Sequence, residues 1–340
     1  MGRPLISVRD LTIQFNTDEG TVTAVERVSF DIAPGEVMGL VGESGSGKSV
    51  TAKALMRLNA PNSFYGPDSR IILNLDDREI DVLALKSPSD LKIIRGGAVS
   101  MVFQEPMASF APALTIGSQM AETLMIHLKV PKHEAKNVAI DMLTRVGISD
   151  ASSRFDQYVV ELSGGMRQRA MIAMALSTKP KLLIADEPTT SLDVTIQAQV
   201  LELMQDLVEE FHMAILFITH DLGVIAQTAD HIAVMYLGQL METGTTRSVI
   251  HQPRHPYTRG LLNAIPKLDE LDAPLVAVSG DIPSPLERPA GCVFHTRCSE
   301  VIKGRCATVE PEIKLVGQDH DVACFAVELA DEERTEKAAP

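Results

Sequence analysis

The chain has 340 residues, of which 45% are hydrophobic and 22% charged, as in a globular protein large enough for more than one domain. Its formal net charge of -14 and its aromatic content of 4%, without any Trp, disfavour binding to nucleic acid. The sequence opens without a secretory signal and has no apolar stretch near the roughly 20 residues that span a bilayer. We therefore expect a soluble protein that reaches a membrane only through membrane partners.

Strand patterns dominate the first hundred residues. Apolar residues alternate with polar ones in the first two strands, and the third strand leads into a glycine-rich loop. A helix is expected directly after that loop, over residues 49–58. The expected strands and strand-rich segments cover residues 6–15, 22–32, 36–41, 71–85 and 98–103.

Residues 106–154 show helical periodicity and no convincing strand, which predicts a helical subdomain inserted into an α/β core. The α/β pattern then returns, with continuous apolar strands of the parallel-sheet kind at 181–185 and 213–218. Helices are expected over 165–176, 195–211 and 222–228, and a strand pair over 232–236 and 239–243. Beyond Gly244 the chain is rich in loops, which suggests a separate C-terminal piece.

Residues 42–49 match the phosphate-loop pattern G-x-x-x-x-G-K-[ST], with a strand before and a helix after. Glycines let successive N–H groups converge on phosphate oxygens, and the helix N-terminus adds its positive end. Lys48 would reach the β- and γ-phosphates, and the Ser49 hydroxyl would bind Mg²⁺. The alternative is a glycine-rich turn that binds nothing. The predicted ATP-binding residues of this loop are Gly42, Ser44, Gly45, Ser46, Gly47, Lys48 and Ser49.

Two adjacent carboxylates, Asp186 and Glu187, end the apolar strand that begins near Leu182. Ligands of doubly wound sheets lie at the carboxyl ends of strands, so Asp186 is suited to hold Mg²⁺. Glu187 could orient or deprotonate the attacking water. A solvated turn would also account for the two charges, but not for their joint occurrence with the phosphate loop.

The segment Leu162-Ser163-Gly164-Gly165-Met166-Arg167-Gln168 resembles LSGGxxQ, the signature of the ABC-transporter ATPase family. Other motifs of that family stand in the expected order: Gln104 resembles its Q-loop, Asp193 its D-loop and His220 its switch histidine. Phe15 resembles the aromatic residue that stacks on adenine. The resemblance covers residues from about Leu5 to Gly244.

This resemblance implies a P-loop NTPase (RecA-like) core with an antiparallel β subdomain and an inserted α-helical subdomain. The implied division is a core over 1–104 and 162–250, a helical subdomain over 105–161 and an extension over 251–340. Two such ATPases would dimerise head to tail. ATP would then lie between the phosphate loop of one subunit and the signature residues of the other, here Ser163, Gly164 and Gly165.

The resemblance implies that Glu187 and His220 take part in ATP hydrolysis. Gln104 would bind Mg²⁺ and couple the site to the permease, and Asp193 would lie at the nucleotide. Taken singly, each residue has a structural alternative: a capping histidine, a surface glutamine, a helix-entry turn at the signature glycines, or a core position for Phe15.

Arg254-His255-Pro256-Tyr257-Thr258 resembles a segment of the ATPases of oligopeptide, dipeptide and nickel importers, including the dipeptide-permease D-type ATPase. This subfamily often carries a cysteine-containing C-terminal extension. In relatives, Ser-Leu-Asn-Pro is common where this chain has Ser109-Phe110-Ala111-Pro112, in a region expected to face the permease.

All four cysteines lie in this extension, at Cys292, Cys298, Cys306 and Cys324. Disulfides are rare in cytosolic proteins, and four thiolates suit Zn²⁺ or an iron–sulfur cluster. Structural zinc usually shows short C-x-x-C pairs, which are missing here, and the resemblance favours a [4Fe–4S] cluster. Four unligated cysteines remain the alternative.

The resemblance implies a peripheral ATPase at the cytoplasmic face of the bacterial inner membrane, powering import of peptides or a related solute. Its partners would be a second ATPase subunit, two separate permease subunits and an extracytoplasmic solute-binding protein, with ATP and Mg²⁺ as cofactors. Two alternatives are a soluble ABC ATPase of translation or DNA repair, and an iron–sulfur redox protein that ATP regulates.

Overall fold

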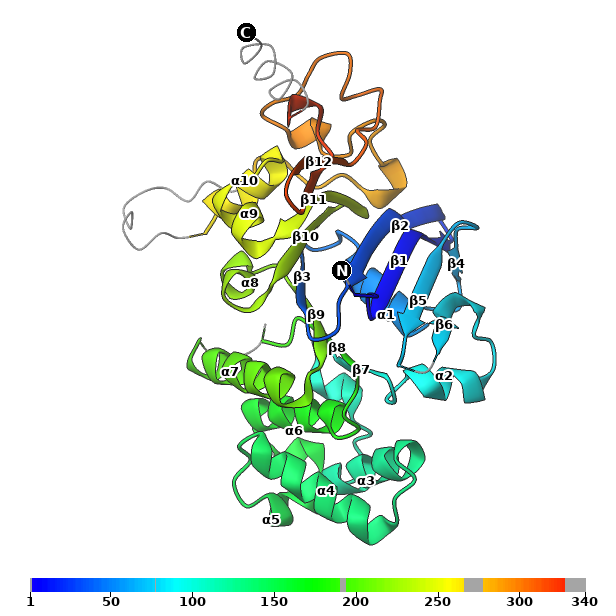
Figure 1. The fold of residues 1–340 in the computed structure, drawn as a ribbon, viewed down its shortest axis with the longest axis vertical. Coiled ribbons are helices and arrows are strands. Elements are labelled where there is room, and N and C mark those ends of the chain that lie inside the picture. Colours follow the sequence, from blue (N-terminus) through cyan, green and yellow to red (C-terminus); the bar gives the residue numbers. More distant parts are fainter. Residues whose placement is uncertain (1, 77, 190–193, 266–277, 328–340) are drawn as a thin grey trace.

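A computed structural model of the chain describes residues 2–76, 78–189, 194–265 and 278–327, and shows an α/β protein with two sheets (Figure 1). In this view the antiparallel sheet lies to the right of strands β3 and β9, helices α3 to α5 lie below them, and the C-terminal extension lies above.

The smaller sheet has five antiparallel strands, in the order β2-β1-β5-β6 with β4 paired to β1. Its two long strands pair from Ile6 opposite Ile32 to Thr17 opposite Gly20. Apolar side chains of these strands are buried in one core, because successive side chains of a strand point to opposite faces. The strands are β1 (Ile6–Thr17), β2 (Gly20–Ile32), β4 (Ser63–Tyr65), β5 (Arg70–Asn74) and β6 (Glu79–Asp81).

The larger sheet has eight strands, in the order β12-β13-β11-β10-β3-β9-β8-β7. The pairs from β10 to β7 are parallel and the remaining pairs are antiparallel. The strands are β3 (Val37–Val41), β7 (Val99–Val102), β8 (Leu182–Asp186), β9 (Ala214–Thr219), β10 (His231–Tyr236), β11 (Gln239–Thr245), β12 (Lys314–Gly317) and β13 (His320–Val322).

The parallel strands are buried on both faces, which explains why they are apolar throughout. In β8, Leu183 packs into the core shared with the helical subdomain, whereas Leu182 and Ile184 pack into the core of the antiparallel sheet and α1. In β9, Phe217 and Leu216 face these two cores in the same way. A sheet covered on both sides reads as a continuous apolar run rather than an alternating one.

Ten α-helices lie in the described residues. In the helical subdomain, Ile116, Met120 and Leu124 form one buried stripe of α3, as an amphipathic helix requires. The helices are α1 (Lys48–Leu55), α2 (Pro88–Ile94), α3 (Ile116–His127), α4 (Lys132–Arg145), α5 (Ala151–Phe155), α6 (Gly164–Leu176), α7 (Val194–Phe211), α8 (Leu222–Thr228), α9 (Thr246–His251) and α10 (Pro256–Asn263). None of the helices in these residues combines the length and the apolar composition needed to cross a membrane.

The residues beyond Gly244 contain more regular structure than the loop-rich sequence predicts. They form α9 and α10, and β13 adds to the main sheet by pairing with β11, with Glu242 opposite Val322. Short strands far from their partners in sequence lack a local signal, because the pairing depends on a long-range contact. The extension therefore continues the main sheet.

Glu242 of β11 anchors the extension from inside this sheet. Its fully buried carboxylate accepts hydrogen bonds from the backbone N–H groups of Arg254 (2.7 Å) and His255 (3.0 Å), and lies 2.7 Å from His320 Nε2. Burial alone would raise the pKa of Glu242, but hydrogen bonds from His320, Thr258 and the two backbone groups lower it below its ordinary value.

We expect Glu242→Gln to lower the stability of the folded chain at neutral pH by about 1–3 kcal/mol, because it removes a charged acceptor that several buried donors share. Folding lowers the pKa of Glu242 below its ordinary value of 4.5. The stabilisation that the Glu242 carboxylate provides is therefore fully present above pH 4.5 and is lost as the pH falls through the pKa of the folded state.

Thermal melting at neutral and acidic pH measures this effect. The exposed Glu312→Gln in the same extension is the control. The melting temperatures of wild type and Glu242→Gln should converge in acid, and an equal gap at both pH values would contradict the assigned role.

Candidate active site

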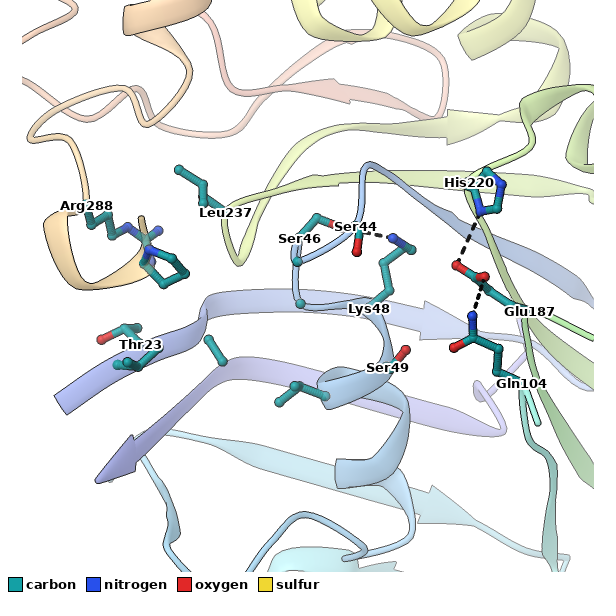
Figure 2. Close-up of a pocket in the computed structure, with 16 residues that line it drawn as sticks. Thr23, Ser44, Ser46, Lys48, Ser49, Gln104, Glu187, His220, Leu237 and Arg288 are labelled. Carbon is teal, nitrogen blue, oxygen red and sulfur yellow. Dashed lines mark hydrogen bonds and ion pairs between the residues drawn. The ribbon is translucent and has the colours of Figure 1, made fainter. Parts of the chain in front are cut away.

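The predicted phosphate loop lines a cavity of about 390 Å³ at the edge of the main sheet. Figure 2 shows loop side chains on one side of this cavity, with Gln104, Glu187 and His220 together on another side. The lining residues are Val22, Thr23, Ala24, Ser44, Gly45, Ser46, Gly47, Lys48, Ser49, Val50, Gln104, Glu187, His220, Leu237, Pro285 and Arg288.

The loop between β3 and α1 needs glycine at two positions for steric reasons. Gly47 has a φ of 100°, and a Cβ there would lie 2.5 Å from the carbonyl oxygen of Ala24. Gly42 has a φ of 151°, and a Cβ there would lie 2.1 Å from the carbonyl oxygen of Met235. The loop can therefore curl tightly against β2 and β10 only without side chains at these positions.

Lys48 is 6% exposed and its ammonium group is held by the loop itself. It donates to the carbonyl oxygens of Gly42 (2.7 Å) and Glu43 (2.9 Å) and to Ser46 Oγ (3.2 Å). Burial lowers the pKa of Lys48, and nearby carboxylates oppose this shift. The site thus holds a cation directed at the loop that is expected to bind phosphate.

Ser49 and Asp186, the two predicted Mg²⁺ ligands nearest the loop, contact each other directly. Ser49 Oγ donates to Asp186 Oδ1 at 2.9 Å. Burial raises the pKa of Asp186, and the hydrogen bond from Ser49 opposes that rise. A hydroxyl and a carboxylate oxygen are ligands that Mg²⁺ prefers, so these residues fit the ion in chemical type.

Glu187 lies between the other two predicted catalytic residues. Its Oε2 accepts a hydrogen bond from Gln104 Nε2 at 3.0 Å, and its Oε1 lies 3.3 Å from His220 Nδ1 (Figure 2). Glu187 has a φ of 46°, a left-handed conformation that is uncommon outside glycine and often marks a functional position. The three residues follow β7, β8 and β9, so parallel pairing brings them to one edge of the sheet.

The signature residues lie elsewhere on the same chain. The described residues that line the cavity do not include Ser163, Gly164 or Gly165, and Ser163 and Gly164 are exposed at the start of α6. Ser163 Oγ caps this helix by accepting the N–H of Met166 at 3.3 Å. A Cβ at Gly164 would meet nothing within 4 Å, so this helix end is open to solvent.

Phe15, a predicted nucleotide contact, is not among the described residues that line the cavity. Phe15 is half-buried against the core of the antiparallel sheet, and Val22, its partner across the β1–β2 pair, lines the cavity instead. The adenine contact of Phe15 thus remains a prediction. Asp193 lies outside the described residues.

Comparison with known proteins is consistent with this geometry. A family model described as "ABC transporter" matches residues 25–190, and one described as "Oligopeptide/dipeptide transporter, C-terminal region" matches residues 241–306. The chain is 45% identical to the dipeptide transport ATP-binding protein DppD of Bacillus subtilis, over 94% of each chain. It is 48% identical to the oligopeptide transport ATP-binding protein OppD of Salmonella typhimurium, over 88% of this chain and 87% of that one.

The chain belongs to the ABC transporter family of ATP-binding proteins. The predicted family and the predicted α/β fold are both confirmed. A solved structure titled as the dimeric form of MJ0796, a bacterial ABC transporter cassette, matches 71% of this chain and 99% of its own length, with a TM-score of 0.61 and 26% identity.

Sequence reasoning missed the part of this ABC cassette's cavity that the C-terminal extension supplies. Pro285 and Arg288 line it, together with Leu237 and three residues of β2. Arg288 Nη2 lies 2.7 Å from Glu26 Oε2 as an ion pair, but neither terminal nitrogen of Arg288 has a well-directed hydrogen-bond partner among the described residues. Burial lowers the pKa of Arg288, and Glu26 opposes the shift. No local motif marks Arg288, because only the fold brings it to the loop.

The four cysteines lie close enough to influence one another's ionisation. Burial raises the pKa of Cys292 to about 12, and the other three thiols add to this rise. Burial also raises the pKa of Cys298 and Cys324. Backbone N–H groups donate to the sulfurs of Cys298 and Cys306, both at 3.4 Å. The donor set suits a metal or cluster in its chemistry.

The positions of these cysteines do not suit a metal ion or a cluster. In the described part of the chain, no three or more His, Cys, Asp or Glu side chains are grouped to hold a metal ion. The predicted iron–sulfur site is therefore not supported by this geometry, and the cysteines are free thiols here.

We expect Arg288→Leu to weaken MgATP binding about tenfold, because it removes donors that an anionic ligand in the cavity would satisfy. Titration with a fluorescent ATP analogue measures this change. Lys303→Leu, an exposed charge change in the same extension, is the control. Equal affinity of wild type and Arg288→Leu would remove Arg288 from the site.

Proposed function

We propose that this chain is the ATP-binding and ATP-hydrolysing subunit that energises an ABC importer of peptides or a related small solute. The observation that carries the proposal is the Glu187 carboxylate, held between Gln104 and His220 beside Lys48 and Ser49. Similarity to peptide-import ATP-binding subunits over nearly the whole chain supports the function of a transport ATPase over that of a soluble ABC ATPase.

The loop would hold the phosphates through backbone N–H groups, the N-terminus of α1 and Lys48. An ammonium group has three donors, and Lys48 already uses them on Gly42, Glu43 and Ser46. Binding to a β- or γ-phosphate oxygen therefore requires Lys48 to release at least one loop oxygen. Stronger, charge-assisted hydrogen bonds to phosphate favour that exchange.

Ser49, Asp186 and Gln104 would hold Mg²⁺, which supplies positive charge to the phosphates when bound. Glu187 would orient the attacking water and accept its proton at a carboxylate oxygen. Gln104 and His220 contact different oxygens of that carboxylate and would fix its direction. These contacts restrict Glu187 to one arrangement, which lowers the entropic cost of reaching a reactive geometry.

The signature residues would serve the ATP of a second subunit. Ser163 and Gly164 are exposed at the N-terminus of α6, where free N–H groups favour a phosphate. Support also comes from the similar solved cassette, which is dimeric. We propose a second ATPase subunit as the partner, a different chain because this family often pairs two different ATPase chains, with Asp193 near their shared nucleotide.

The remaining partners follow from the importer assignment. Two separate permease subunits would contact the helical subdomain, which we place at residues 105–161, and an extracytoplasmic solute-binding protein would deliver the solute. The chain would then be peripheral at the cytoplasmic face of the bacterial inner membrane. Nucleic acid has no part in this assignment.

We expect Glu187→Gln to keep MgATP binding and to lower the hydrolysis rate by about 10²–10⁴-fold, since it removes the proton acceptor but not the phosphate contacts. It should also accumulate an ATP-bound dimer, seen by size-exclusion chromatography. Glu209→Gln, an exposed change of the same kind on α7, is the control. Unchanged turnover in Glu187→Gln would contradict the role of Glu187.

A [4Fe–4S] cluster on Cys292, Cys298, Cys306 and Cys324 is a separate proposal. It rests on the family resemblance and on the chemistry of the four thiols, two of whose sulfurs accept backbone N–H groups. Such a site would have to form by rearrangement as the cluster binds. Anaerobically purified protein should contain iron and acid-labile sulfide, and zinc or free thiols alone would refute the cluster.

A further inference from the structure

Glu43, the second residue of the phosphate loop, is held by the C-terminal extension at two points. Arg297 forms a two-pronged ion pair with its carboxylate, with Nη1 2.7 Å from Oε2 and Nη2 3.1 Å from Oε1. The backbone N–H of Glu43 donates to the Tyr257 hydroxyl oxygen at 2.9 Å. These contacts join residues more than 200 positions apart in the sequence.

Arg297 is rigidly placed. Its side chain is 3% exposed, and it donates from Nε to the carbonyl oxygen of Ser279 (3.0 Å) and from Nη2 to that of Val278 (3.1 Å). Its guanidinium also lies 5.6 Å from the centre of the Tyr236 ring. The hydrogen bond with Glu43 raises the pKa of Arg297. Paired donors in a fixed plane define direction as well as charge.

Tyr257 is equally fixed. It is fully buried near the start of α10, with its ring centre 4.9 Å from that of Tyr236 and 5.2 Å from that of Phe294. Burial raises the pKa of Tyr257, so its hydroxyl stays neutral. The N–H of Glu43 therefore meets an acceptor that belongs to a packed aromatic cluster and not to a mobile loop.

The same residue contacts the phosphate-binding lysine on its other side. The carbonyl oxygen of Glu43 accepts hydrogen bonds from Lys48 Nζ (2.9 Å) and from the N–H of Ser46 (3.2 Å). The Glu43 peptide thus lies between the extension and the groups expected to bind phosphate. Arg297 and Tyr257 are absent from the cavity lining in the described residues, so they would act through Glu43 and not on ATP itself.

We infer that Arg297 and Tyr257 are positioning residues that hold the phosphate loop in its ATP-binding conformation, so that the C-terminal extension sets the affinity for MgATP. This inference rests on the proposed function of the loop. A pre-arranged loop loses less conformational entropy when the phosphates bind. Loss of Arg297 would also leave the Glu43 carboxylate unpaired beside an anionic ligand, which adds repulsion.

The test is a double-mutant cycle on Glu43→Ala and Arg297→Met, read by titration with a fluorescent ATP analogue. Each single change should raise the Kd for MgATP about tenfold. The double variant should have the same Kd as a single variant, because either change alone already removes the contact between Glu43 and Arg297. Additive effects, or singles with wild-type Kd, would overturn the inference.

Further variants separate positioning from general stability. Arg297→Lys keeps the charge but not the paired geometry, and should restore part of the affinity. Tyr257→Phe should raise the Kd about threefold, since one acceptor is lost. Arg259→Met breaks the exposed pair of Arg259 with Glu300 (2.7 Å) in the same extension and should leave the Kd unchanged. A loss in Arg259→Met equal to that in Arg297→Met would indicate a merely structural role.

Steady-state kinetics add a second readout to the binding titration. In steady-state hydrolysis, KM should rise more than kcat falls, because the ATP-binding step is affected. If Arg297→Met fails to fold, Glu43→Ala alone tests the inference, because the Glu43 side chain is 25% exposed on the loop and its removal leaves the core intact. Wild-type protein that binds no MgATP would refute the proposed function. Wild type that binds MgATP, with Glu43→Ala equal to it, would refute only the positioning role.

Discussion

Parallel pairing of β3, β9, β8 and β7 is the constraint on which the active site depends. The carboxyl ends of these strands meet at one edge of the sheet, and the phosphate loop, His220, Glu187 and Gln104 each follow one of them. Helices and the second sheet cover both faces of these strands, so the strands must be apolar throughout. Polar residues can therefore occur only where these buried strands end, which is where the site forms.

The groups at that edge are coupled to one another. Asp186 is buried against Ser49, Lys48 is buried among loop oxygens, and Glu187 is directed from two sides. Burial shifts the pKa of Asp186 upward and that of Lys48 downward, so the charged form of each depends on partners and, in the proposed function, on nucleotide and Mg²⁺. In the proposed function, a second subunit would complete the site with its own signature residues.

Local patterns made the loop, the carboxylates after β8 and the family predictable, because each depends on neighbouring residues in the chain. The contribution of the extension was not predictable in this way. Arg288 reaches the cavity and β13 joins the sheet only through contacts between distant segments. Phe15 packs partly against the core of the antiparallel sheet while its cross-strand partner Val22 lines the cavity, and the contact of Phe15 with adenine remains a prediction. The cysteine spacing likewise could not reveal how the four thiols are arranged.

The central claim is that this chain binds ATP at the loop that begins at Gly42. Equilibrium titration of MgATP into the wild-type chain and into Lys48→Ala tests it most directly. The account predicts saturable binding by the wild type and its loss in the variant, because the buried cation that would contact the phosphates has been removed. Equal binding by both, or no binding by the wild type, would contradict it.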